Sequence, residues 1–228
     1  MSAADGSGGL MAAAFFDFDR TLIDINSAPR YALWEYRQGR VSALQCARAL
    51  MWSVGYHFSL VDIEAAYRVA LAHYRGLPEA EARARTEAWY QAELVARAQP
   101  GALRALARHR RDGVPTVLLT NSSGYAADLA TQQYGLDASI ANVFPADASG
   151  LLLGTFEAPI CYGEGKVIRA TAWAASAGVD LQQSWFYTDS LSDLPMLEVV
   201  GYPVVVNPDP RLRREARRRG WPIEDWRR

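Results

Sequence analysis

Two pairs of aspartates each follow an apolar run in this sequence, and their spacing suits metal binding. Asp17 and Asp19 follow residues 11–16 in the segment DFDRT, and Asp189 and Asp193 follow the run WFYT. A single Asp after a strand is often only a helix cap or a turn residue. Carboxylates that lie close together are costly, however, unless a cation or a shared proton compensates their charge. Oxygen ligands suit Mg²⁺ better than softer metals, so we predict that these four aspartates form a magnesium site.

Two further residues could complete a site for phosphate. Thr120 ends the apolar run 115–120, and its hydroxyl, with the following amides of Asn121 and Ser122, could hold anionic oxygens. Lys166 ends the segment GEGK, where it could place a positive charge on a phosphate and on a carboxylate. Alone, such a threonine is usually a helix cap and such a lysine a surface charge. Their occurrence with the aspartates favours the phosphate site.

A parallel sheet would bring these residues together. Continuous apolar runs that end in polar residues are typical of strands buried on both faces of such a sheet, and ligands bind at the carboxyl ends of those strands. Helical patterns lie between the runs, which indicates βαβ units and a doubly wound α/β fold. The runs are residues 11–16, 115–120, 185–188 and 203–206, and the helical patterns are residues 101–111, 125–134 and 166–177.

Residues 26–98 are too long and too helical to be a simple crossover, which needs about a dozen residues. We therefore predict a helical subdomain, 26–98, inserted into a core formed by 11–25 and 99–228, after a disordered stretch at 1–10. Glycines in residues 147–159 indicate a small hairpin. The basic tail, residues 211–228, is interpreted as a solvated helix that ends at Gly220 and is followed by apolar residues packed on the core.

The overall composition excludes several classes of protein. The chain has 228 residues, 50% of them hydrophobic, and a formal net charge of -1, so nothing draws it to nucleic acid or to acidic membranes. Cys46 and Cys161 do not make a disulfide framework and are expected to be free, buried thiols in a reducing cytoplasm. No targeting segment or membrane span is evident, because the longest apolar stretch, 49–61, is too short. The oligomeric state is not indicated.

The segments FFDFDRTL, VLLTN, GEGK and YTDSLSDLP resemble, in the same order, the four motifs of the haloacid dehalogenase-like (HAD) hydrolase superfamily. The tail VNPDPRLRREARRRGWPI and the segment ICYGEGK are similar to subfamily IB, the phosphoserine-phosphatase-like branch. The resemblance covers about residues 12–228. It implies a Rossmann-like core with a type 1 cap, formed here by the helical insertion, and a Mg²⁺-dependent phosphatase that acts on a small phosphorylated metabolite.

The resemblance also implies roles for single residues. Asp17 would be the nucleophile that forms an aspartyl-phosphate and a ligand of Mg²⁺. Asp19 would give a proton to the leaving alcohol, then take one from water, and its main-chain carbonyl would contact the metal. Both roles agree with the chemistry, because a carboxylate attacks a phosphate only when their charges are neutralised, and an alkoxide needs a proton to leave.

The remaining motif residues would bind phosphate and metal. The resemblance implies that Thr120, Asn121 and Lys166 hold the transferring phosphoryl group. It further implies that Asp189 binds Mg²⁺ directly and that Asp193 supports the metal site or holds Lys166.

The resemblance leaves the substrate open. Phosphoserine phosphatases are expected to have a Glu nine residues after the nucleophile, where this sequence has Asn26; Asp24 could substitute with different geometry. Phosphoserine is therefore less favoured than histidinol phosphate, our leading single hypothesis. Aromatic residues of the insertion could hold a flat group or form its core: Trp34, Trp52, Tyr56 and Phe58.

Two other functions use similar residues. A phosphotransferase would pass the aspartyl-phosphate to an alcohol instead of water. A receiver-type signalling domain also combines an acidic pair, a phosphorylated Asp, a Thr or Ser and a Lys on a doubly wound sheet. The long insertion and the second acidic motif at Asp189 and Asp193 argue against the receiver.

Overall fold

The computed structural model describes residues 10–57 and 62–227, with the backbone alone for 52–57. Its centre is a six-stranded sheet in which all pairs are parallel, in the order β3-β2-β1-β4-β5-β6. The strands are β1 (Ala14–Phe16), β2 (Thr116–Ser123), β3 (Ala138–Asn142), β4 (Trp185–Thr188), β5 (Tyr202–Val206) and β6 (Ile223–Glu224). The predicted doubly wound α/β fold is confirmed.

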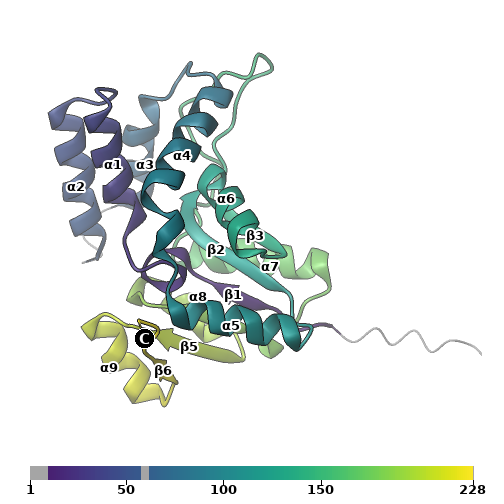
Figure 1. Ribbon diagram of the computed structural model, residues 1–228. Helices are drawn as coiled ribbons and strands as arrows, with labels where there is room; N and C mark the ends of the chain where they lie inside the picture. Colours follow the sequence, from purple (N-terminus) through teal and green to yellow (C-terminus); the bar gives the residue numbers. More distant parts are fainter. Residues whose placement is uncertain (1–9, 58–61, 228) are drawn as a thin grey trace, which may run out of the picture.

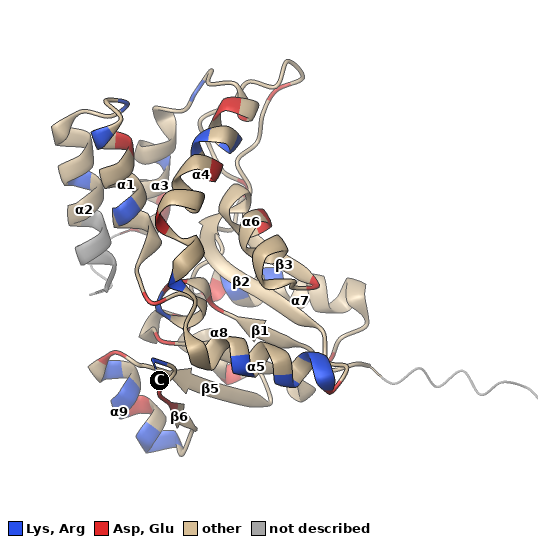
Figure 2. Ribbon diagram, viewed as in Figure 1, with Lys and Arg blue, Asp and Glu red and all other residues tan. Residues whose placement is uncertain are grey.

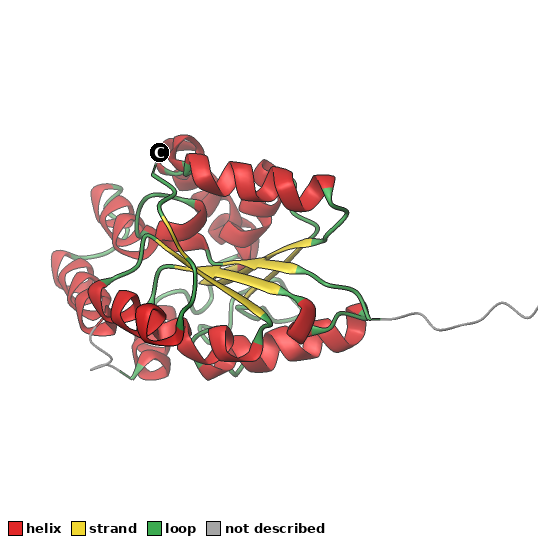
Figure 3. Cartoon of the chain, turned by 90° about the horizontal axis from the view of Figure 1, so that it is seen from below, coloured by secondary structure: helices red, strands yellow, loops and turns green. Residues whose placement is uncertain are grey.

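Helices cover both faces of this sheet, as the view in Figure 3 shows. Neighbouring side chains of a strand point to opposite faces, so Phe16 packs beneath α5 and α6 while Phe15 packs beneath α7 to α9. The predicted helical patterns are confirmed within a few residues. The helices are α5 (Pro100–Arg111) and α6 (Gly124–Tyr134) on one face, and α7 (Glu164–Ala177), α8 (Leu194–Val199) and α9 (Pro210–Arg219) on the other.

Four helices between β1 and β2 extend away from the sheet, at the upper left of Figure 1. They are α1 (Ser27–Arg37), α2 (Ala43–His57), α3 (Ile63–Ala72) and α4 (Glu79–Glu93). The chain enters and leaves this insertion side by side: the amide of Asp24 donates to the carbonyl of Arg97 (3.0 Å), and that of Gln99 to Leu22 (2.9 Å). The two connections therefore form one narrow junction with the sheet.

Some predicted elements differ from the structure. Two strands, β3 and β6, were not predicted, and β1 begins at Ala14 because Met11 makes only a single bridge with Val179. The segment 147–159, predicted as a small hairpin, begins with a tight antiparallel turn in which Ala146 bridges Leu152, without regular strands on either side. Another bridge joins the turn to the insertion at Pro78. Of the predicted disordered stretch 1–10, residues 1–9 lie outside the described part.

The C-terminal segment packs back on the core, as predicted. The basic helix α9 ends at Gly220, and its arginines are the blue parts of its ribbon in Figure 2. Arg218 and Arg219 pair with Glu215 of the same helix. Trp226 is 2% exposed and contacts the rings of Phe16 and Tyr187. Space for its indole depends on Gly101, where a Cβ would lie 2.3 Å from the ring. The tail is therefore part of the core and not a loose extension.

A buried hydrogen-bond relay connects this tail to the turn after β1. The amide of Trp226 donates to the side chain of Asn207 (3.0 Å), which donates to Gln99 Oε1 (2.6 Å). Gln99 then donates to the carbonyls of Arg20 (2.6 Å) and Thr21 (3.0 Å). The relay holds the turn after β1 from the opposite end of the sequence.

The structure also bears on the predictions about the cysteines and about membrane spans. Cys46 and Cys161 are both buried and unpaired by disulfide, as predicted. Over the described residues, no helix combines the length and apolarity needed to cross a bilayer.

Candidate active site

The predicted polar residues meet at the carboxyl edge of the sheet. Strand β1 lies between β2 and β4, so Asp17, which follows β1, lies between Thr120 on β2 and Asp189 after β4. Asp17, Thr120 and Asp189 are each less than 10% exposed. The strand order, and not the sequence spacing, therefore brings residues from three distant segments together.

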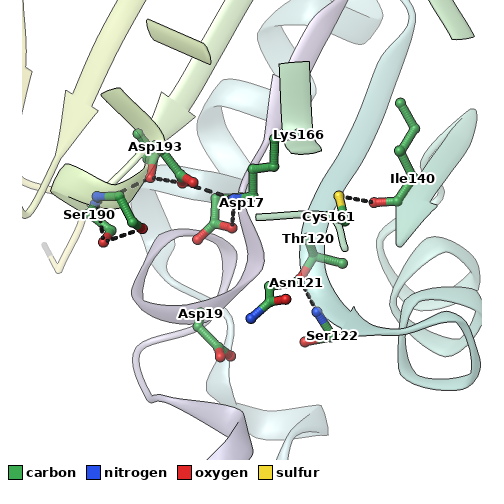
Figure 4. A network of polar contacts seen from close by, with 12 residues as sticks. Asp17, Asp19, Thr120, Asn121, Ser122, Ile140, Cys161, Lys166, Ser190 and Asp193 are labelled. Atoms are coloured by element: carbon green, nitrogen blue, oxygen red, sulfur yellow. Dashed lines mark hydrogen bonds and ion pairs between the residues drawn. The ribbon is translucent and has the colours of Figure 1, made fainter. Parts of the chain in front are cut away.

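Lys166 joins two of the aspartates (Figure 4). Its Nζ donates to Asp17 Oδ1 (2.7 Å) and to Asp193 Oδ2 (2.8 Å), and Asp193 Oδ2 also accepts from the hydroxyl of Thr188 (2.6 Å). The lysine is brought in by the first turn of α7, which packs so tightly that a Cβ at Gly165 would lie 1.8 Å from the carbonyl oxygen of Ile160. The glycine in the GEGK segment therefore permits this close approach.

The charges of this site are strongly coupled. Burial disfavours the charge on Lys166, but Asp17 and Asp193 outweigh it and raise the pKa of the lysine, which stays protonated. Burial raises the pKa of Asp17 to about 7, even though Lys166 opposes the shift. Burial and the charge of Asp17 also raise the pKa of Asp189. The charge of Lys166 alone therefore does not neutralise the carboxylates around it.

Asp19 lies on a tight turn, Phe18–Leu22, that follows Asp17 and contains Arg20 at a φ of 58°. Both carboxylate oxygens of Asp19 accept hydrogen bonds from Ser27, the first residue of α1, from its amide (3.0 Å) and its hydroxyl (2.9 Å). Burial raises the pKa of Asp19 to about 6, and the bonds from Ser27 limit the rise. Asp19 can therefore exist in both protonation states near neutral pH.

The part of β2 that follows Thr120 differs from the expectation in one respect. The amide of Ser122, expected to face an anion, donates instead to Thr120 Oγ1 (3.0 Å). The carbonyl of Asn121 accepts from the hydroxyl of Tyr67 (2.6 Å) and from Nδ2 of Asn142 (2.7 Å). The main chain at Asn121 and Ser122 is thus fixed on both sides.

Sequence reasoning missed four residues that contact the site. Ser27 and Tyr67 come from the helical insertion, and only its docking on the core brings them near. Asn142 ends β3 and would have been found had that strand been recognised. Arg20, whose Nε lies 3.3 Å from Asp189 Oδ2, follows Asp19 directly but is brought to Asp189 by its unusual backbone conformation.

Other residues considered for substrate selection lie as follows. Asn26 is half-buried and directly precedes α1, while Asp24 is exposed at the junction, 3.9 Å from Arg97. Trp34 packs against the hydrophobic cluster beneath α5 and α6. Phe58 and the side chains of Trp52 and Tyr56 lie outside the described residues.

A divalent cation fits the donor set of this edge. Asp17 and Asp189 are buried acids whose pKa values are raised, and the positive charges paired with them are those of Lys166 and the half-exposed Arg20. Among the described residues, no cluster of three or more His, Cys, Asp or Glu side chains could hold a metal. A Mg²⁺ would therefore need main-chain, water or substrate oxygens beside two carboxylates, which is its usual coordination in phosphate chemistry.

Comparison with known families identifies the class of protein to which this fold and this site belong. A family model described as haloacid dehalogenase-like hydrolase matches residues 14–198, which is most of the chain. The chain belongs to this family, and the predicted enzyme class, a HAD-type hydrolase, is confirmed. The match also favours a hydrolase over a receiver-type domain.

Individual relatives are similar over nearly the whole chain. Phosphoserine phosphatase SerB1 of Mycobacterium tuberculosis is 32% identical over 225 residues, which cover 96% of this chain and 72% of that protein. A histidinol-phosphatase of Neisseria meningitidis is 27% identical over 214 residues, 92% of this chain and 96% of that protein. A solved structure of a protein with unknown function from Bordetella pertussis has a TM-score of 0.86 and 27% identity, covering 95% and 99% of the two chains.

Proposed function

We propose that this chain is a Mg²⁺-dependent phosphatase that hydrolyses a small phosphate monoester through an aspartyl-phosphate on Asp17. The observation that carries the proposal is the position of Lys166, which contacts Asp17 at 2.7 Å and Asp193 at 2.8 Å in a buried site at the sheet edge. A carboxylate next to a permanent positive charge can approach a phosphate dianion, which it would otherwise repel.

In the first step, an oxygen of Asp17 attacks phosphorus and the bond from phosphorus to the ester oxygen breaks. Asp19, protonated below its pKa of about 6, gives its proton to the leaving alkoxide. Lys166 and the hydroxyl of Thr120 hold the phosphoryl oxygens, and Asn121 lies beside them. Asp193, engaged by Lys166 and Thr188, holds the lysine in place.

In the second step, Asp19, now ionised, takes a proton from a water molecule that attacks the aspartyl-phosphate. The bond between phosphorus and Asp17 breaks, so inorganic phosphate leaves and the carboxylate is restored. Asp17, Asp189 and the main-chain carbonyl of Asp19 are the groups that would hold Mg²⁺. The ion would neutralise charge on the phosphoryl oxygens.

The helical insertion 26–98 is proposed as the cap that selects the substrate, over a core formed by 11–25 and 99–228. Relatives named phosphoserine phosphatase and histidinol-phosphatase both support a small phosphorylated metabolite. Histidinol phosphate is the favoured hypothesis, because the alignment covers 96% of the histidinol-phosphatase but 72% of the phosphoserine phosphatase.

The test is phosphate release from a panel of esters with Mg²⁺, for wild type and Asp17→Asn. The panel includes histidinol phosphate, phosphoserine, sugar phosphates and nucleotides. The variant should fold, because the change is nearly isosteric, and should lose turnover, because an amide does not attack phosphorus. Retention of more than a few per cent of the activity would show that Asp17 is not the nucleophile.

A further inference from the structure

One peptide unit at the site is held by hydrogen bonds at both of its ends. The carbonyl of Asn121 accepts from the hydroxyl of Tyr67 (2.6 Å) and from Nδ2 of Asn142 (2.7 Å). The amide of Ser122, on the opposite side of the same planar unit, donates to Oγ1 of Thr120 (3.0 Å). Any group that fixes the carbonyl therefore also fixes the direction of the amide toward Thr120.

The two donors to this carbonyl come from different parts of the fold. Asn142 belongs to β3, is 1% exposed, and its Oδ1 accepts from the amide of Cys161 (2.8 Å). Tyr67 belongs to α3 of the insertion, and its ring contacts Phe144 and Phe156 at 6.3 and 6.1 Å between centroids. The insertion thus hydrogen-bonds directly to the part of β2 that follows Thr120.

The hydroxyl of Thr120 has one hydrogen and two lone pairs. Because the amide of Ser122 uses a lone pair, the hydrogen of the hydroxyl is left to donate elsewhere. Asp17 lies on the adjacent strand end, so a phosphoryl group on that residue is the acceptor within reach. A chain of hydrogen bonds also polarises its members, so a bond at one end strengthens the donor at the other.

We propose that Tyr67 is a positioning residue that orients the hydroxyl of Thr120 toward the phosphoryl group through the Asn121–Ser122 peptide unit. The inference rests on the proposed role of Thr120 in phosphate binding. It links the insertion to the chemistry of the core: when α3 is docked, Tyr67 completes the chain of hydrogen bonds, and Thr120 becomes a better donor.

The test begins with Tyr67→Phe, which removes one hydroxyl and keeps the ring packing. Its control is Tyr134→Phe, which removes another buried hydroxyl, one that has no hydrogen-bond partner among the described residues. With Mg²⁺ present, we expect Tyr67→Phe to weaken orthovanadate binding and to lower kcat/KM, each by roughly three- to tenfold, the effect of one lost hydrogen bond. The control should change neither.

Melting temperature separates a positioning role from a purely structural one. If Tyr67→Phe lowers the melting temperature and leaves vanadate binding and kcat/KM as in wild type, the hydroxyl only supports the fold and the inference is wrong. A loss of vanadate affinity at a melting temperature close to that of the control supports it.

A double-mutant cycle tests whether Tyr67 acts through Thr120. In Thr120→Val, which lacks the hydroxyl, Tyr67→Phe should cause no further loss of vanadate affinity. An equal loss in both backgrounds would overturn the inference. Calorimetry of vanadate binding needs no turnover, so a chain that hydrolyses no ester but shows this coupling would refute the proposed function alone. Normal turnover without the coupling would refute only the role of Tyr67.

Discussion

Both carboxylate oxygens of Asp19 accept hydrogen bonds from Ser27, so the protonation and the orientation of Asp19 depend on the first residue of α1. We expect Asp19→Asn to lower kcat for an alkyl phosphate by roughly 10²- to 10⁴-fold, the usual contribution of a general acid. An activated aryl phosphate should lose far less in the first step, because its leaving group barely needs a proton. Steady-state kinetics with both esters measures the difference, and equal losses would count against Asp19 as the acid.

The same contact predicts a shift in the pH profile. Only protonated Asp19 can act as the acid, so kcat/KM for an alkyl ester should fall as pH rises above its pKa, about 6 in the metal-free chain. The bonds from Ser27 stabilise the carboxylate and lower this pKa, so Ser27→Ala should raise it and move the falling limb to higher pH. Ser27→Thr keeps the hydroxyl and is the matched control. If the falling limb of the pH profile stays at the same pH in Ser27→Ala, this result would contradict the assignment of Asp19 as the acid.

We expect substrate choice to depend on the insertion, because the core residues of the proposed mechanism would act on the phosphoryl group alone. Asn26 precedes α1, where a carboxylate would also be compatible with the helix N-terminus. Asn26→Glu should shift preference toward esters that carry an ammonium group, such as phosphoserine, over sugar phosphates by about ten- to a hundredfold, since a charge-assisted hydrogen bond contributes roughly 1.5–3 kcal/mol.

The measurement is kcat/KM of wild type and Asn26→Glu for phosphoserine and for a sugar phosphate, which has no ammonium group. Asn26→Gln has similar length without the charge and serves as the control. A wild type that already prefers phosphoserine by a large margin would contradict the argument from Asn26. Asp24 would not easily replace it, because it lies exposed beside Arg97 at the junction.

Elements with a strong local pattern could be predicted, and those defined by their neighbours could not. Strands β2, β4 and β5 have continuous apolar runs that end in polar residues. Strand β3 begins with Ala and Ser and was not predicted. Strand β6 has two residues, which form a strand only because they pair with β5.

The candidate site divides in the same way. Asp17, Thr120, Lys166 and Asp189 could be named because each follows a recognisable strand or begins a helix. Tyr67 gives no local signal: it lies within an ordinary helix, and only the docking of α3 brings its hydroxyl to Asn121.

At the scale of the whole molecule, the buried carboxyl groups predict how stability depends on pH. The metal-free folded chain raises the pKa of Asp17 to about 7 and of Asp19 to about 6. It therefore binds more protons than the unfolded chain between about pH 4 and 7, so this contribution to stability is lost as pH rises through that window. His109 acts oppositely: burial lowers its pKa to about 4, and its contribution is lost only as pH falls below about 6.5.

We therefore expect the melting temperature in EDTA to be lower at pH 8 than at pH 6.5. Mg²⁺ should raise it more at pH 8, where protons no longer compete with the ion for the carboxylates. In Asp17→Asn the side chain at position 17 cannot ionise. This variant should therefore show a smaller pH dependence of the melting temperature and a smaller rise of it with Mg²⁺. Scanning fluorimetry at the two pH values measures this, and an equal gain at both would mean that Mg²⁺ does not displace these protons.

The relay from Trp226 through Asn207 and Gln99 has a consequence for biosynthesis. The turn that carries Asp19 is made early. Gln99, which donates to its carbonyls, is itself held by Asn207, and Asn207 accepts from Trp226 near the end of the described chain. At translation rates of about 5–20 residues per second, the turn waits roughly ten to forty seconds for Trp226. A nascent chain can therefore form its early helices on the ribosome, but it completes the turn beside Asp17 only after β5 and the tail have emerged and packed.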